Sequence, residues 1–177
     1  MPTTLTVNPI TAKVSWDYQS TNNFGTNSIQ NASFTYSKST TNGTGAGKAQ
    51  KLHVDTLTIA GGATTTLDLD GVLTDVFGTA ISFDRIKVIY IELTTTTTST
   101  SITVGGHATQ AFRNWITGAP DMDTAQPKIR VRNGGCFFLA CTDATGYDVT
   151  NTTQDKLNIT NEDGSNAATV NICLIGE

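Results

Sequence analysis

The chain has 177 residues, enough for one domain with a hydrophobic core or for one domain and an ordered arm. Charged residues make up 15% of it and the formal net charge is -4, so nothing supports nucleic-acid binding, which usually needs a basic excess. No run approaches the roughly 18 apolar residues of a membrane helix, and the first residues lack the charged and apolar parts of a secretory signal. We expect a protein that is made in a cytoplasm and has no membrane partner.

The amino-acid usage favours β-sheet. Thr accounts for 34 residues and Glu for only three. Thr is β-branched and fits a half-exposed pleated surface, whereas Glu is depleted in strands. The three cysteines are an odd number, and in a reducing compartment we expect them to be free thiols.

Residues 1–50 are polar and rich in Gly, Asn, Ser and Thr. Apolar side chains alternate with polar ones in residues 5–7, 14–18 and 34–36, which predicts short strands. Residues 40–47 have the composition of a loop, and we place a domain boundary there. The segment 1–50 is therefore interpreted either as an N-terminal arm or as additional strands of the main domain.

From residue 51 onward the strand pattern is sharper. The apolar phase shifts between Val54 and Leu57, which suggests a bulge, and residues 71–78 form the one plausible helical turn, ended by Gly78. Residues 83–93 are almost continuously apolar and predict a central strand buried on both faces. The other predicted strands are 52–59, 64–69, 102–104, 111–116, 128–132, 136–141, 147–149, 157–160 and 169–175. Such short strands with frequent turns predict an all-β fold, an antiparallel β-sandwich of jelly-roll type over residues 51–177.

Candidate catalytic groups are sparse. His53 lies within a predicted strand, on the face opposite Leu52 and Val54, and His107 lies in a turn. Neither belongs to a nucleophile motif, so we interpret both as structural and expect no enzymatic activity.

The acidic residues and cysteines do not form a recognisable metal motif. Asp68, Asp70 and Asp75 lack the terminal Glu of a calcium loop, and Asp121 with Asp123 falls in a predicted loop. Turn-capping is the interpretation that we favour for both groups, with a divalent ion as the alternative. Cys136 and Cys141 have the wrong spacing for zinc and no accompanying His. We therefore predict no metal and no cofactor.

One charge pattern suggests an interface. Lys128, Arg130 and Arg132 share one face of a predicted strand because side chains alternate along a strand, and Arg113 is a further candidate. In an acidic protein such a basic stripe can meet another subunit or an anionic glycan, or it can simply be a solvated face. The aromatic residues Trp16, Phe112, Trp115 and Tyr147 would stack on sugars if exposed, but we expect core packing for them.

Seven short segments carry a recognisable pattern: residues 64–69, 73–78, 83–87, 102–106, 131–135, 145–149 and 171–176. Through these segments, residues 52–176 resemble small virion structural proteins of tailed bacteriophages. The resemblance implies a jelly-roll-like module on a viral particle, most specifically a capsid decoration (cement) protein, or else the base of a head fibre or a tail component. It also implies a homo-oligomer such as a trimer, and contacts with other virion proteins such as the major capsid protein.

These observations lead to two functional expectations. The first is a bacteriophage structural protein that is made in the host cytoplasm and located in the virion. The second is a carbohydrate- or receptor-binding module of a phage tail or fibre. Both work by binding, and an N-terminal arm can strengthen such binding by pairing with a neighbour's sheet edge.

Overall fold

A computed structural model of the chain describes residues 4–21, 27–95, 100–115 and 127–177, with the backbone alone for 18–21 and 27–31. The described residues form strands and turns without a helix, which confirms the predicted all-β class. The strands are β1 (Val7–Thr21), β2 (Asn27–Asn42), β3 (Lys48–Ala49), β4 (Lys51–Ile59), β5 (Thr64–Asp68), β6 (Asp70–Thr74), β7 (Ala80–Ser82), β8 (Arg85–Leu93), β9 (Ser101–Gly105), β10 (Lys128–Arg132), β11 (Cys136–Ala140), β12 (Tyr147–Asp148), β13 (Lys156–Asn161) and β14 (Ala168–Gly176).

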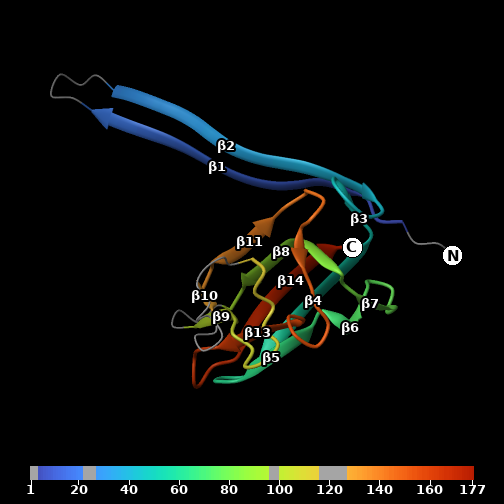
Figure 1. The fold of residues 1–177 in the computed structure, drawn as a ribbon. Coiled ribbons are helices and arrows are strands. Elements are labelled where there is room, and N and C mark those ends of the chain that lie inside the picture. The colour runs from blue at the N-terminus through green and yellow to red at the C-terminus, as the bar shows by residue number, and fades with distance from the viewer. Residues whose placement is uncertain (1–3, 22–26, 96–99, 116–126) are drawn as a thin grey trace.

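Two antiparallel sheets form a β-sandwich (Figure 1). We name them the inner sheet, with strand order β10-β9-β13-β5, and the outer sheet, with strand order β11-β8-β14-β4. The short strand β12 pairs with β8 beside β11. A separate hairpin of β6 and β7 follows β5.

The core lies between the two sheets and follows from side-chain alternation. Ile159 of β13 and Ile172 of β14 are buried there, while the residues next to them in each strand point the other way. Strand β8 is buried on both faces, with Ile89 in the main core and Val88 in a second, smaller cluster. This confirms the central strand predicted from the apolar run.

Asn161 ties the ends of the two sheets together. Its buried side-chain amide donates hydrogen bonds to the carbonyl oxygens of Ile59, Ala60 and Asn166, at 3.1, 3.2 and 2.8 Å. The turn after β4 and the turn before β14 are thereby held to the end of β13. A polar residue is stable at this depth because its amide is fully used.

The first two strands form a long two-stranded ribbon that leaves the sandwich (Figure 1). Beyond a register shift between Val7 and Ile10, β1 and β2 pair without interruption to Thr21 and Asn27. We call this ribbon the arm. Only β3 joins it, through a short parallel pairing with β2.

Two local predictions in residues 52–78 are wrong. Strand β4 pairs with β14 in continuous register, so no bulge separates Val54 from Leu57. The apolar phase shifts because Leu52 packs into the smaller cluster outside the sheet, whereas Leu57 packs against the main core. Residues 71–78 form most of the β6–β7 hairpin, in which the Asp75 carboxylate accepts hydrogen bonds from the N–H groups of Phe77 and Thr79.

The strand predicted at 111–116 is also not formed over its described part. Ala111 makes an isolated bridge to Lys156, and the chain then turns so that the indole N–H of Trp115 donates to the Phe112 carbonyl, at 2.8 Å. Phe112 is buried in the main core and Trp115 packs over it. The apolar residues at 111–115 therefore belong to a turn whose aromatic side chains pack into the main core.

Candidate interaction surface

The two faces of the arm differ sharply in polarity. Directly paired residues lie on the same face of an antiparallel ribbon. One face carries the pairs Thr11–Ser37, Lys13–Thr35 and Ser15–Ser33, and the other carries Ala12–Tyr36, Val14–Phe34 and Trp16–Ala32. The arm is therefore an amphipathic ribbon with one polar and one apolar face.

Near the sandwich, the apolar face of the arm is covered. Ile10 is buried, and Tyr36 lies edge-on to Phe138 of β11 with 6.5 Å between the ring centroids. Both belong to a cluster that includes Val88 and Ile175 on the outside of the outer sheet. The base of the arm is thus packed on its own chain.

Farther out, the apolar face is open to solvent. Val14 is 66% exposed and Phe34 is 76% exposed, and the Trp16 ring contacts Phe34 with 5.2 Å between centroids. We call Val14, Trp16, Ala32 and Phe34 the arm face. Neither hydrophobic core cluster includes any of these four residues.

The outside of the outer sheet carries two neighbouring apolar rows. The strand register aligns Ala140, Val88, Ile175 and Leu52 in one row, which the arm base covers. The next row, which we call the open row, contains Phe138, Tyr90, Cys173 and Val54. Val54 is 50% exposed and Tyr90 is half-buried. Phe138 and Cys173 are half-buried and also pack against the smaller cluster, so this row is only partly covered by the arm base.

Beyond the open row the outside of the sheet becomes polar. Thr56 donates a hydrogen bond to Asn171, and Asn171 donates one to Glu92. Burial and the Glu92 carboxylate together raise the pKa of the adjacent Tyr90 hydroxyl. The apolar surface outside this sheet is therefore bounded on one side by the arm base and on the other by hydrogen-bonded polar side chains.

Buried charges fasten the base of the arm. The Glu177 carboxylate accepts a hydrogen bond from the Gly45 N–H at 2.6 Å and pairs with Arg85 at 3.0 Å. The fully buried Lys87 ammonium lies 3.6 Å from Glu177 and donates to the Asp143 carbonyl at 2.6 Å. Burial alone would raise the pKa of Glu177, but the Gly45 N–H and the two cations outweigh it and lower that pKa. The turn after β2 is thus tied electrostatically to the sandwich.

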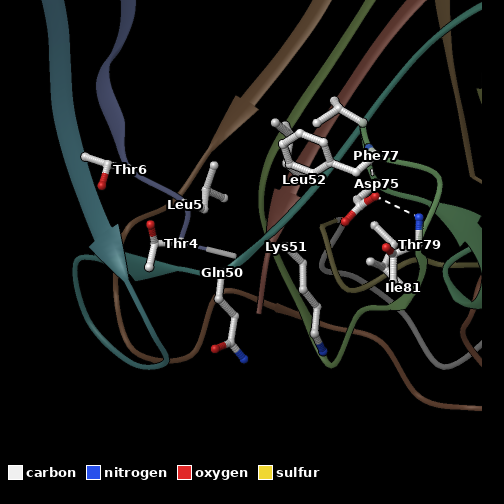
Figure 2. A pocket seen from close by; sticks show the side chains of 11 residues that line it. Thr4, Leu5, Thr6, Gln50, Lys51, Leu52, Asp75, Phe77, Thr79 and Ile81 are labelled. Atoms are coloured by element: carbon white, nitrogen blue, oxygen red, sulfur yellow. Dashed lines mark hydrogen bonds between the residues drawn. The ribbon is translucent and has the colours of Figure 1, made fainter. Parts of the chain in front are cut away.

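A pocket of about 360 Å³ lies beside the arm base, between the segment 4–6 and the β6–β7 hairpin (Figure 2). Leu5, Leu52, Phe77 and Ile81 supply apolar walls, and Gln50 and Lys51 supply polar ones. Phe77 is largely exposed. The Asp75 carboxylate at the rim is occupied by the N–H groups of its own turn.

The structure places the predicted basic stripe on the edge strand of the inner sheet. Lys128, Arg130 and Arg132 are exposed along β10, which pairs only with β9 among the described strands. Arg113 is half-buried in the turn at residues 111–115 and is not part of β10. An interface role for these four residues stays a prediction.

The histidines occupy structural positions. His53 is buried and its Nδ1 lies 2.8 Å from the Thr74 carbonyl oxygen, so it links β4 to the β6–β7 hairpin. Nδ1 of His107 accepts hydrogen bonds from the N–H groups of Thr109 and Gln110 and so caps its own turn. No carboxylate is recorded as a partner of either ring in the described part of the chain.

The cysteines and acidic residues offer no obvious reactive centre. All three cysteines are free thiols, and burial raises the pKa of Cys141 and of Cys173, which disfavours the thiolate. Within the described ranges, no three His, Cys, Asp or Glu side chains gather as metal ligands. Asp121 and Asp123 lie outside the described residues. The described residues also contain no helix with the length and apolarity that crossing a membrane requires.

Sequence reasoning did not identify the arm face. It treated Trp16 as a core residue, whereas Trp16 contacts Phe34 within the arm and belongs to neither core cluster. A usable signal was present, since the alternating apolar residues at 14–16 and 34–36 lie in a segment otherwise made of polar residues. No protein-family model, curated protein or solved structure matches the chain.

Proposed function

We propose that this protein is a structural component of a bacteriophage virion, most specifically a capsid decoration protein, that assembles through its arm. The observation that carries the proposal is the exposed apolar face of the arm. A two-stranded ribbon is marginal in water by itself, and an exposed apolar surface of this kind usually marks a protein contact.

We also propose that the sandwich is a jelly roll, and the strand order supports this. If β4, β5, β8, β9, β10, β11, β13 and β14 are counted as strands one to eight, the outer sheet reads 1-8-3-6 and the inner sheet reads 2-7-4-5. The antiparallel pairs are then 1 with 8, 2 with 7, 3 with 6 and 4 with 5. This pairing is the one expected of a long hairpin rolled into two sheets, and it therefore supports a jelly roll, an architecture common in viral capsid proteins.

The chemistry of the described residues fits a non-enzymatic role. The buried charges Lys87 and Glu177 hold backbone groups of the arm base and of the turn after β11, and both histidines serve turns or strand contacts. Assembly of this kind needs no cofactor.

Purified virus particles that carry this gene test the proposal. We expect mass spectrometry to find the chain in washed particles at a fixed ratio to the major capsid protein, and cryo-electron microscopy to show it on the outside of the shell. Finding the chain only in the particle-free fraction would contradict the proposal.

The pocket beside the arm base favours a second candidate, a glycan- or receptor-binding module of a tail or fibre. Phe77 presents an aromatic ring at a pocket that also contains Gln50 and Lys51 (Figure 2), and sugars are commonly bound by such combinations. Glycan-array binding that is lost in Phe77→Ala but kept in Val72→Ala, an exposed position in the same hairpin, would support this alternative.

A further inference from the structure

We infer that the arm face of one copy docks on the open row of the outer sheet of a second copy. This inference rests on the proposed function and names the partner of the arm. The arm face comprises Val14, Trp16, Ala32 and Phe34, and the open row comprises Phe138, Tyr90, Cys173 and Val54.

A smaller contact of the same kind, between the apolar face of the arm and the outer sheet, already exists within one chain. At the arm base, Ile10 and Tyr36 from the same apolar face cover the row that contains Val88 and Ile175. The arm face continues that covering surface outward, and the open row continues the covered row across the sheet. Each exposed surface therefore extends one half of an existing interface.

The arm face is not packed on its own open row, because Val14 and Phe34 remain mostly exposed. From Ile10 to Thr21 the arm extends about 35 Å at the usual rise of a strand. Over this length β1 and β2 are paired without a bulge, and the far end of the arm projects past the sandwich (Figure 1).

The charges are compatible with a contact between like copies. The chain carries a net charge of -4, so two copies repel one another at long range. The arm face contains no charged side chain, because Lys13 and Asp17 lie on the polar face of the ribbon. Glu92 lies one row beyond the open row and is engaged by Asn171.

Sedimentation of the purified full chain over a concentration series tests the inference. We expect the full chain to self-associate as its concentration rises. Phe34→Asp on the arm should raise the dissociation constant by about 30-fold or more, and Val54→Asp on the sheet should raise it as well. Ser33→Asp is the matched control, since it places the same charge beside Phe34 on the polar face, and we expect less than about a twofold change. All three positions are exposed, so circular dichroism and the melting temperature are expected to stay unchanged.

Cross-linking then identifies the surfaces that meet. In a background with Cys136→Ser and Cys173→Ala, which removes the thiol directly opposite position 54, the Phe34→Cys variant is mixed with the Val54→Cys variant and oxidised. Linked peptides that join position 34 of one copy to position 54 of another support the inference. A chain that stays monomeric, association that survives Phe34→Asp, an equal effect of Ser33→Asp, or links only between two arms would overturn it.

The two proposals fail in different ways. If the chain is monomeric in solution but occurs at a fixed ratio in particles, the docking inference is wrong and the proposed function stands. If the arm-dependent oligomer forms but the chain is absent from particles, the docking contact stands and the proposed function is wrong.

Discussion

Among single residues, Lys87 and Glu177 form a buried ion pair between the sandwich and the base of the arm. Both side chains are buried, and they lie 3.6 Å apart at the junction of β8, the end of β14 and the turn after β2. Lys87 completes its hydrogen bonding with the carbonyl oxygens of Asp143 and Ala144. Buried ions are tolerated only when such partners are present, so each of these groups depends on the other.

Replacing Glu177 by Gln should make the stability less dependent on acid pH. The pKa of Glu177 is lower in the folded chain than its ordinary value of 4.5, so the carboxylate stabilises the fold above that pH. This contribution is lost as the pH falls through the lower, folded pKa. We expect Glu177→Gln to cost about 3 kcal/mol at pH 7, because Lys87 loses its buried counter-charge, and to cost little below the folded pKa.

Urea unfolding at a series of pH values checks this expectation. Asp84→Asn is a suitable control, since Asp84 pairs with Lys51 but is mostly exposed, and exposed ion pairs contribute little. An equal loss for Glu177→Gln at pH 7 and at the acid end of the series would show that the charge on Glu177 is not the stabilising feature.

Among the elements, β14 holds the outer sheet together because it pairs with both β4 and β8. At its end Gly176 lies so close to the Arg85 carbonyl and the Phe83 ring that a Cβ atom would collide with both. We expect Gly176→Ala to destabilise the fold by about 3 kcal/mol, since backbone must move to relieve the overlap. The melting temperature measures this effect.

Gly164 provides the comparison for that substitution. A Cβ atom at Gly164 meets nothing within 4 Å, so Gly164→Ala should change the free energy of unfolding by less than about 0.5 kcal/mol. Similar melting temperatures for the two variants would mean that the end of β14 yields easily, contrary to our expectation.

The strands that sequence reasoning predicted best have most of their buried side chains in the main core. In β8, β13 and β14 the spacing of apolar residues is set by burial between two sheets, and the predicted boundaries lie within one or two residues of the observed ones. The bulge predicted in β4 is wrong because a second apolar surface, on the outside of the outer sheet, also buries a residue of that strand. Leu52 packs in the smaller cluster, which the base of the arm covers. That packing depends on a contact between residues far apart in the sequence.

The candidate interaction surface was harder to predict than the fold, because it too depends on contacts between residues far apart in the sequence. The basic stripe on β10 is visible in sequence because three charges share one strand face. The arm face needs the pairing of β1 with β2, which alone brings Val14 beside Phe34 and Trp16 beside Ala32. The length of the pairing was also hidden, since polar Thr, Ser and Asn residues separate the apolar ones.

At the scale of the whole molecule, two parts meet at a small interface. The sandwich has its own large core, whereas the arm shares only the smaller cluster and the buried charges at its base. We therefore propose that stability and assembly depend on different residues, and we expect that the outer arm can be altered without loss of the sandwich.

Shortening the arm should separate these two properties. In the variant, residues 14–34 are replaced by Asn-Gly, which joins the paired residues Lys13 and Thr35 through a tight hairpin turn. Ile10 and Tyr36 remain in place, and the deleted arm face belongs to neither core cluster. We therefore expect urea unfolding to give a free energy within about 1 kcal/mol of the parent chain, while self-association in sedimentation is lost. A loss of several kcal/mol would mean that the outer arm stabilises the sandwich, and unchanged association would mean that another surface joins the copies.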